Sequence, residues 1–291
     1  MSSKYGSVFF SLLIIFVLAA SALSCGQEEM SDKIGVVVTL QPQAEFVENV
    51  GGEMVKINVM VPPGASPHTY EPTPGQMTEA AKAKMYAKVG SGVEFELTYM
   101  DKIAAVNKNM LVVDCSKGIH LTASEDPDEP GMDPHIWVSP RNAQIMVQNI
   151  CAGLIQVDPE NKAYYEMNRD TYLDKLDELD IEISDKLANI QNRAFIVLHP
   201  SWGYFARDYN LEQIAIEVGG KEPSAQDIAR IIEEAKKRNI KVIFASPQFN
   251  PQSAKVIAKE IDGRVILIDN LARDYIANLQ AVLNELSQAM E

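Results

Sequence analysis

The hydrophobic pattern predicts a long helix in the middle of the chain, over residues 159–190. Residues 160–190 contain neither proline nor glycine, and Asp158 and Pro159 suit the N-cap and the first helical position. Apolar residues recur at the three- and four-residue steps of one helical face: Tyr172, Leu176, Leu179, Ile183, Leu187 and Ile190. At about 1.5 Å per residue the helix would span about 48 Å, more than one small lobe needs. It is therefore either a coiled-coil arm or a spine between two lobes.

Short β-branched runs alternate with helical patterns on both sides of this helix. Strands are predicted at 34–39, 56–61, 85–89, 110–114, 194–198, 213–217, 241–245 and 264–268. Helices are predicted at 43–50, 75–84, 94–106, 201–208, 224–237, 251–261 and 272–290. Such alternation favours parallel sheets covered by helices. The predicted fold class is α/β, with two similar (β/α)4 lobes whose mainly parallel four-stranded sheets are joined by one long spine helix.

The first residues have the pattern of an export signal. Lys4 precedes an apolar run over residues 8–23, and small residues lead to Cys25. This pattern resembles a lipoprotein signal, in which Cys25 would be acylated, although Ala22 stands where leucine is usual. An uncleaved anchor or an ordinary secretion signal is the alternative. Each of these interpretations places the protein outside the cytoplasm. The predicted segments are a signal (1–25), a flexible tether (26–33), a first lobe (34–158), the linker helix (159–190) and a second lobe (191–291).

The net charge limits the expected partners, and the positions of the cysteines limit disulfide formation. The formal net charge is −14, from 40 acidic and 26 basic residues, so nucleic acid is excluded as an expected partner because no basic excess exists to neutralise phosphates. Cys115 and Cys151 could pair in an exported protein. Their predicted positions, at a strand end and inside a helix, favour two buried thiols. Residues 122–134 form an acidic, proline-containing loop, which we interpret as solvated.

Three of the four histidines fall where α/β proteins bind ligands, outside the carboxyl ends of strands. His68 and His199 follow predicted strands, Asp269 follows another, and His135 lies beyond a longer loop. Three imidazoles and one carboxylate would satisfy four-coordinate zinc, although imidazole also suits copper, nickel and iron. The alternative for each histidine is a surface residue or a hydrogen-bonded core residue. His120 lacks this placement and is not expected to bind a metal.

Enzyme motifs are missing from the sequence. There is no Gly-x-Ser-x-Gly elbow, no phosphate-binding glycine loop and no dinucleotide fingerprint. We therefore expect a binding protein and no catalytic residues.

Five stretches carry a resemblance to a known family: Pro67-His68-Thr69-Tyr70-Glu71-Pro72, Asp133-Pro134-His135-Ile136-Trp137, Leu198-His199-Pro200-Ser201-Trp202-Gly203-Tyr204-Phe205, Lys221-Glu222-Pro223-Ser224 and Val265-Ile266-Leu267-Ile268-Asp269. From about residue 34 onward the chain resembles the solute-binding proteins of zinc and manganese ABC importers. The resemblance implies that His68 and His135 from the first lobe, and His199 and Asp269 from the second, hold a metal between the lobes. Manganese-binding members tend to have a carboxylate at the position of His199, so the resemblance favours Zn²⁺, with Mn²⁺ or Fe²⁺ as alternatives. Ser246 and Asn270 differ from the residues common in the family.

The resemblance also implies a function. The expected protein captures zinc outside the cytoplasm, in the periplasm or at the cell surface. It would be held at the membrane by a lipid on Cys25 and deliver the metal to an ABC transporter membrane permease, acting as a monomer. The alternatives are manganese or iron binding in the same transporter class and a metal-binding surface adhesin.

Overall fold

The computed structural model describes residues 33–124, 131–217 and 222–290. The predicted export signal, including Cys25, and all but the last residue of the predicted tether lie outside the described residues. Residues from Ile34 onward belong to one unit, and the following description concerns that unit. Among the helices in the described part of the chain, none has both the length and the apolar character needed to cross a bilayer.

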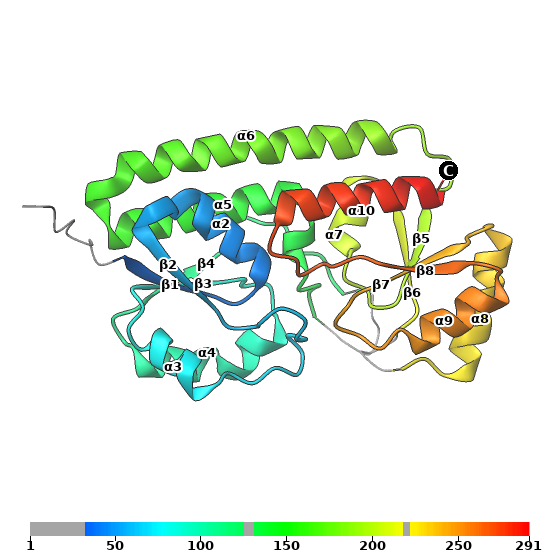
Figure 1. The fold of residues 1–291 in the computed structure, drawn as a ribbon, viewed down its shortest axis with the longest axis horizontal. Helices are drawn as coiled ribbons and strands as arrows, with labels where there is room; N and C mark the ends of the chain where they lie inside the picture. The colour runs from blue at the N-terminus through cyan, green and yellow to red at the C-terminus, as the bar shows by residue number, and fades with distance from the viewer. Residues whose placement is uncertain (1–32, 125–130, 218–221, 291) are drawn as a thin grey trace, which may run out of the picture. The chain divides into compact units, whose positions relative to one another are not determined.

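The first lobe is built on a parallel sheet with the strand order β2-β1-β3-β4. Its strands are β1 (Ile34–Val38), β2 (Val55–Val59), β3 (Met85–Lys88) and β4 (Leu111–Asp114). Its helices are α2 (Gln41–Gly51), α3 (Pro74–Ala80), α4 (Glu94–Val106) and α5 (Pro140–Val157). Helices α2 and α5 cover one face of the sheet, and α3 and α4 lie on the other (Figure 1).

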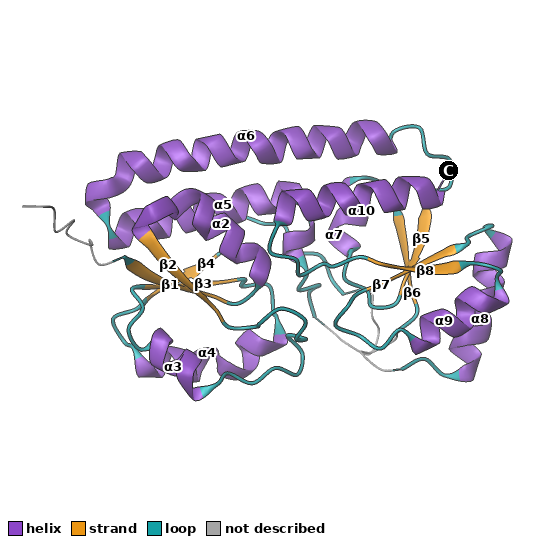
Figure 2. Ribbon diagram, in the orientation of Figure 1, coloured by secondary structure: helices purple, strands orange, loops and turns teal. Residues whose placement is uncertain are grey.

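The second lobe repeats this topology, with the strand order β6-β5-β7-β8. Its strands are β5 (Ala194–Val197), β6 (Glu212–Ala215), β7 (Val242–Ala245) and β8 (Arg264–Leu267). Its helices are α7 (Gly203–Asp208), α8 (Ala225–Lys237), α9 (Gln252–Glu260) and α10 (Tyr275–Met290). The two strand clusters, each with helices on both faces, are seen in Figure 2. The fold class predicted from the sequence is confirmed.

Alternating side chains of β5 separate two hydrophobic cores, as the two-residue period of a strand requires. Ala194 and Ile196 face a small core beneath α8 and α9. Phe195 and Val197 face a larger core that includes the apolar residues of the first lobe. The two lobes therefore share one continuous core on the side where the long helix lies.

The long helix α6 (Lys162–Leu187) begins later and ends earlier than the sequence predicts. A 3₁₀ turn (Pro159–Asn161) precedes it, and the Asp158 side chain makes no capping bond. That carboxylate instead accepts hydrogen bonds from Asn161 Nδ2 at 2.8 Å and from Tyr165 Oη at 2.6 Å. An uninterrupted helix from Pro159 and an Asp158 cap are therefore wrong, because this local pairing replaces the cap.

The predicted apolar stripe is buried on α6 from Tyr172 to Leu187, and its last member, Ile190, lies beyond the end of the helix and is half-buried. The helix packs against α2 and α5 of the first lobe and against α10 of the second. Polar contacts support both halves: Tyr172 Oη donates to Glu45 at 2.7 Å, and Tyr209 Oη donates to Asp180 at 2.7 Å. The interpretation as a spine is thus supported over the coiled-coil arm.

Noncovalent contacts also join the lobes, which the sequence did not reveal. The start of α10 lies on α2, where the Phe46 and Tyr275 rings meet edge to face at 4.9 Å. Arg273 and Glu48 form an ion pair at 2.8 Å beside them. The long helix is therefore not the only element that fixes one lobe against the other.

Cys115 and Cys151 are both free and buried, in agreement with the prediction of two buried thiols. Burial raises the pKa of the Cys115 thiol and of the Cys151 thiol.

Candidate metal centre

Three histidines from distant parts of the sequence meet at one point. One possible ligand atom of each of His68, His135 and His199 lies within 4.8 Å of those of the other two. The ring centroids of His68 and His199 are 5.1 Å apart, and those of His135 and His199 are 5.3 Å apart. The structure thus brings together three of the four residues that the sequence singled out.

His199 is placed by the central strand of the second lobe. It follows β5 by two residues and is 5% exposed. Strand β6 pairs with β5 so that Ala215 lies opposite Val197, and Glu217 therefore lies level with His199. The His199 Nδ1 and Glu217 Oε2 atoms are 2.9 Å apart.

His135 comes at the end of the long loop after β4 and is also 5% exposed. Asp133 Oδ1 accepts hydrogen bonds from the His135 backbone N–H at 2.9 Å and from His135 Nδ1 at 2.8 Å. A 3₁₀ turn (Ile136–Val138) follows directly and buries its three side chains. The two bonds to one carboxylate oxygen fix both the backbone and the ring of His135.

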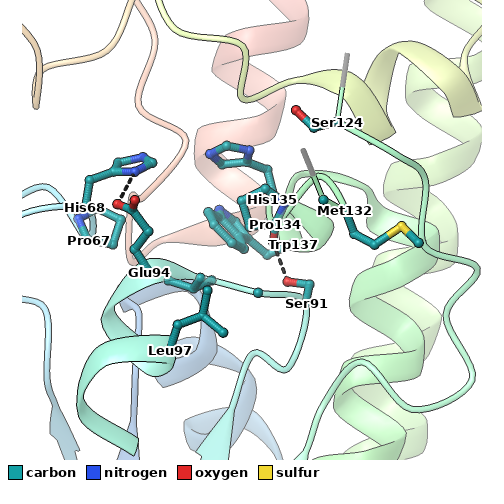
Figure 3. A pocket seen from close by; sticks show the side chains of 13 residues that line it. Pro67, His68, Ser91, Glu94, Leu97, Ser124, Met132, Pro134, His135 and Trp137 are labelled. Atoms are coloured by element: carbon teal, nitrogen blue, oxygen red, sulfur yellow. Dashed lines mark hydrogen bonds and ion pairs between the residues drawn. The ribbon is translucent and has the colours of Figure 1, made fainter. Parts of the chain in front are cut away.

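His68 lies on the proline-rich loop between β2 and α3. Its Nδ1 is 2.9 Å from Glu94 Oε2, at the first residue of α4. This pair is the most open of the three, since 23% of the His68 side chain and 52% of the Glu94 side chain are exposed. Figure 3 shows this pair joined by a dashed line, with the His135 ring on another element facing the same pocket.

Each imidazole is therefore held at Nδ1 by a carboxylate. A carboxylate accepts hydrogen bonds, so Nδ1 carries the proton and Nε2 is the nitrogen that would bind a metal. Zinc–imidazole bonds of 2.0–2.1 Å in tetrahedral geometry place ligand nitrogens about 3.4 Å apart. The observed separations of up to 4.8 Å require only a small approach of the rings. The donor set fits a zinc-like cation.

Aromatic rings border the three histidines. Phe249 stacks on His199 with centroids 4.4 Å apart, and Trp137 lies 5.3 Å from His135. A cavity of about 370 Å³ opens beside His68 and His135, and another of about 560 Å³ opens beside His68 and His199. The site is thus walled by apolar rings and still reachable from solvent.

Asp269 lies outside the group formed by the three histidines. Its Oδ1 accepts hydrogen bonds from Gln248 Nε2 at 2.8 Å and from the Leu271 backbone N–H at 2.9 Å. Its role as a fourth ligand stays a prediction. His120 is exposed and outside the group, and its carbonyl accepts a bond from Arg207 at 3.1 Å.

Sequence reasoning missed the three carboxylates that hold the imidazoles. Asp133 had a signal, because it stands two residues before His135. Glu217 could have been found only with the knowledge that its strand neighbours β5. Glu94 had no signal, since the loop conformation alone brings His68 to the start of α4.

Two parallel-sheet lobes on one long helix, with candidate ligands facing each other from both lobes, define the class of two-lobed solute-binding proteins. The chain belongs to the family described as "ZnuA: Zinc-uptake complex component A periplasmic", whose model matches residues 36–289.

Relatives and solved structures support this membership. The chain is 31% identical to the "High-affinity zinc uptake system protein ZnuA" of Bacillus subtilis, over 88% of each chain. It is 30% identical to the "Manganese ABC transporter substrate-binding lipoprotein scaA" of Streptococcus gordonii, over 86% of this chain and 84% of that protein. A solved structure titled "Crystal structure of ZnuA" matches with a TM-score of 0.86 and 40% identity, covering 89% of this chain and all of the other.

Proposed function

We propose that this protein captures Zn²⁺ outside the cytoplasm and delivers it to an ABC transporter membrane permease. His68, His135 and His199 would bind the ion through Nε2, and Asp269 would supply a fourth ligand. The ion is cargo, so the site has to bind it tightly and also release it.

The observation that carries this proposal is the pairing of all three imidazoles with carboxylates. Metal-binding histidines usually donate their second ring N–H to such a partner, which fixes the tautomer and raises ligand basicity. A histidine in an ordinary core needs no such arrangement at three convergent positions. Two of the three rings are almost fully buried, so the site is organised in the fold itself.

The ligand chemistry favours zinc over manganese. Imidazole-rich sites suit zinc, whereas manganese prefers carboxylate, carbonyl and water oxygens. The named relatives include both a zinc and a manganese protein, so the preference for zinc rests on the donor atoms of this chain. Iron is the remaining alternative.

Charge and the N-terminal sequence support the proposed setting. An acidic surface, with a net charge of −14, raises the local concentration of cations. Acylation of Cys25 would keep the protein at the membrane beside its permease, and a single chain would suffice because both halves of the site lie in it.

Competition titration against a chromophoric zinc chelator tests the proposal. The purified protein should bind one Zn²⁺ with a dissociation constant well below about 1 μM and bind Mn²⁺ much more weakly. The control is His120→Ala, which should bind zinc like the parent because His120 lies outside the site. Binding weaker than micromolar, or tighter binding of Mn²⁺ than of Zn²⁺, would overturn the proposal of a zinc carrier.

A further inference from the structure

We propose that Gly203 and Tyr204 of the second lobe are positioning residues for His135 of the first lobe. They act through Asp133, the carboxylate that holds the His135 ring. The inference rests on the proposed function, because it concerns a ligand of the proposed metal site.

Asp133 occupies the contact between the two lobes. Its Oδ1 holds His135 by two hydrogen bonds, at 2.8 and 2.9 Å. Its backbone carbonyl accepts a bond from Tyr204 Oη at 3.0 Å. Its residue exposure is 9%, so little water can replace these partners. One residue therefore bonds both to the candidate ligand and to the opposite lobe.

Gly203 leaves the space that Asp133 needs. A Cβ atom at position 203 would lie 2.5 Å from Asp133 Oδ2, far inside van der Waals contact. The carboxylate cannot turn away freely, because its other oxygen is held by His135. A methyl group at position 203 would thus displace Asp133 and, with it, the His135 ring.

Tyr204 holds the same segment from a second side. Its hydroxyl donates to the Asp133 carbonyl and accepts a bond from the Thr122 backbone N–H at 3.2 Å. Its ring is fully buried, and the Arg207 guanidinium lies 4.8 Å from the ring centroid. Both ends of the long loop before His135 are therefore bonded to one tyrosine of the other lobe.

The position of His135, a first-lobe residue, therefore depends on contacts with the second lobe. Trp137, two residues beyond it, also donates across the lobes to the Asn270 carbonyl at 2.7 Å. His135 and His199 form a pair whose geometry requires the contact between the lobes. Among the hydrogen bonds of the described residues, His68 is held from its own lobe only, by Glu94 at its ring and by Ser66 Oγ at its backbone N–H, 3.3 Å away.

The test begins with Gly203→Ala in the full-length protein. Mutation of residues that orient metal ligands costs about 10–100-fold in affinity, so zinc binding should weaken by at least about tenfold. The matched control is Gly75→Ala, since Gly75 is exposed in α3 and its Cβ would meet only Thr73 Oγ1, at 3.9 Å. That variant should bind zinc within about twofold of the parent. Tyr204→Phe should show a smaller loss than Gly203→Ala.

A double-mutant cycle separates positioning from general damage, because only residues that act through one another are non-additive. In a His135→Ala background, Gly203→Ala should cost no further zinc affinity. In a His68→Ala background it should still cost at least about tenfold. Equal losses in both backgrounds, or unchanged affinity in the single variant, would overturn the inference. Failure of the parent itself to bind zinc would instead overturn the proposed function.

Discussion

The two lobes share one strand order but place different residues at the end of the central strand. In the second lobe, β5 leads within two residues to His199, a candidate ligand. In the first lobe, β1 leads to Thr39, whose hydroxyl is fully buried in a hydrogen-bonded network. The backbone bonds beyond the strands match Thr39 with Leu198, one residue before His199. The end of the central strand thus carries a candidate metal ligand in one lobe and a buried structural network in the other.

The network at the end of β1 fixes the framework that carries the loops of the first lobe. Thr39 Oγ1 lies 3.0 Å from Tyr86 Oη and donates to Glu96 Oε1 at 2.5 Å. The Glu96 carboxylate also accepts from the backbone N–H groups of Val89, at 2.6 Å, and Gly90, at 2.9 Å. The network therefore ties the ends of β1 and β3 to α4.

The difference shows two ways of holding a ligand. His199 closely follows the end of a strand and is held by a carboxylate that closely follows the neighbouring strand. His68 and His135 lie on loops, so their positions depend on carboxylates and, for His135, on the opposite lobe. The comparison predicts unequal effects when equivalent changes are made in the two lobes.

The largest effect should come from breaking the element that both lobes share. Leu176→Pro, in the buried stripe of α6, removes a helical hydrogen bond and should destabilise the protein by about 3 kcal/mol or more. Zinc affinity should be lost although no ligand is changed. Urea unfolding and competition titration check this, with Asp174→Ala on the exposed face as the control. Unchanged zinc affinity in Leu176→Pro would show that the lobes do not depend on this helix.

Removal of single imidazoles should give the next largest effects. His199→Ala should weaken zinc binding by more than about a hundredfold, since even the loss of an orienting partner costs about 10–100-fold. His68→Ala should cost less, because its ring is partly exposed on a loop and water can take its place. Competition titrations of the two variants side by side measure both losses of zinc affinity. A larger loss in His68→Ala than in His199→Ala would contradict this ranking.

Substitution of the carboxylate partners should show a smaller difference in zinc affinity between the two lobes. Glu217→Gln replaces a carboxylate, of which 11% of the side chain is exposed, by a neutral amide that is a weaker acceptor, and should weaken zinc binding by about 10–100-fold. Glu94→Gln should lie at or below the low end of that range, because exposed ion pairs contribute little. Similar losses in the two variants would remove the distinction between a strand-held and a loop-held ligand.

The smallest expected effect is on the pH dependence of stability, through Glu96 in the hydrogen-bonded network at the end of β1. Burial raises the pKa of the Glu96 carboxyl above its ordinary value of 4.5. The folded state therefore binds more protons than the unfolded state above that pH, so this carboxyl lowers stability as pH rises from about 4.5 towards the folded-state pKa. Between pH 4.5 and pH 7, the parent should lose stability relative to Glu96→Gln, which cannot titrate.

Urea unfolding of the metal-free protein at several pH values measures this slope. Glu160→Gln is the matched control, because Glu160 is exposed, and its slope should follow that of the parent. A parallel slope for Glu96→Gln and the parent would contradict the assignment of a raised pKa to Glu96.

Much of the fold could be predicted from the sequence because both sheets are parallel and buried. Buried parallel strands appear as short β-branched runs, and the observed β1 (Ile34–Val38) and β8 (Arg264–Leu267) differ from the predicted strands by a single residue at the carboxyl end. The start of α6 was not predictable in the same way. There the side chains of Asn161 and Tyr165 both donate to the Asp158 carboxylate, which then makes no capping bond, and rules based on local sequence pattern do not describe this arrangement.

The candidate site was predicted only in part for a similar reason. Strand ends located His68 and His199, because ligands gather outside the carboxyl ends of parallel strands. The partners Glu94 and Glu217 required knowledge of loop paths and strand neighbours, which the sequence does not state. The contact of Gly203 with Asp133 depends on how the lobes pack, and the hydrophobic periodicity of the sequence does not predict it.

X-ray absorption at the zinc edge of the protein loaded with one equivalent of Zn²⁺ tests the central claim most directly. The account predicts four-coordinate zinc with three imidazole nitrogens at about 2.0–2.1 Å. The imidazole signal should fall by one ring in His135→Ala. A spectrum without imidazole scattering, or one that is unchanged in His135→Ala, would contradict a zinc site made by the three convergent histidines.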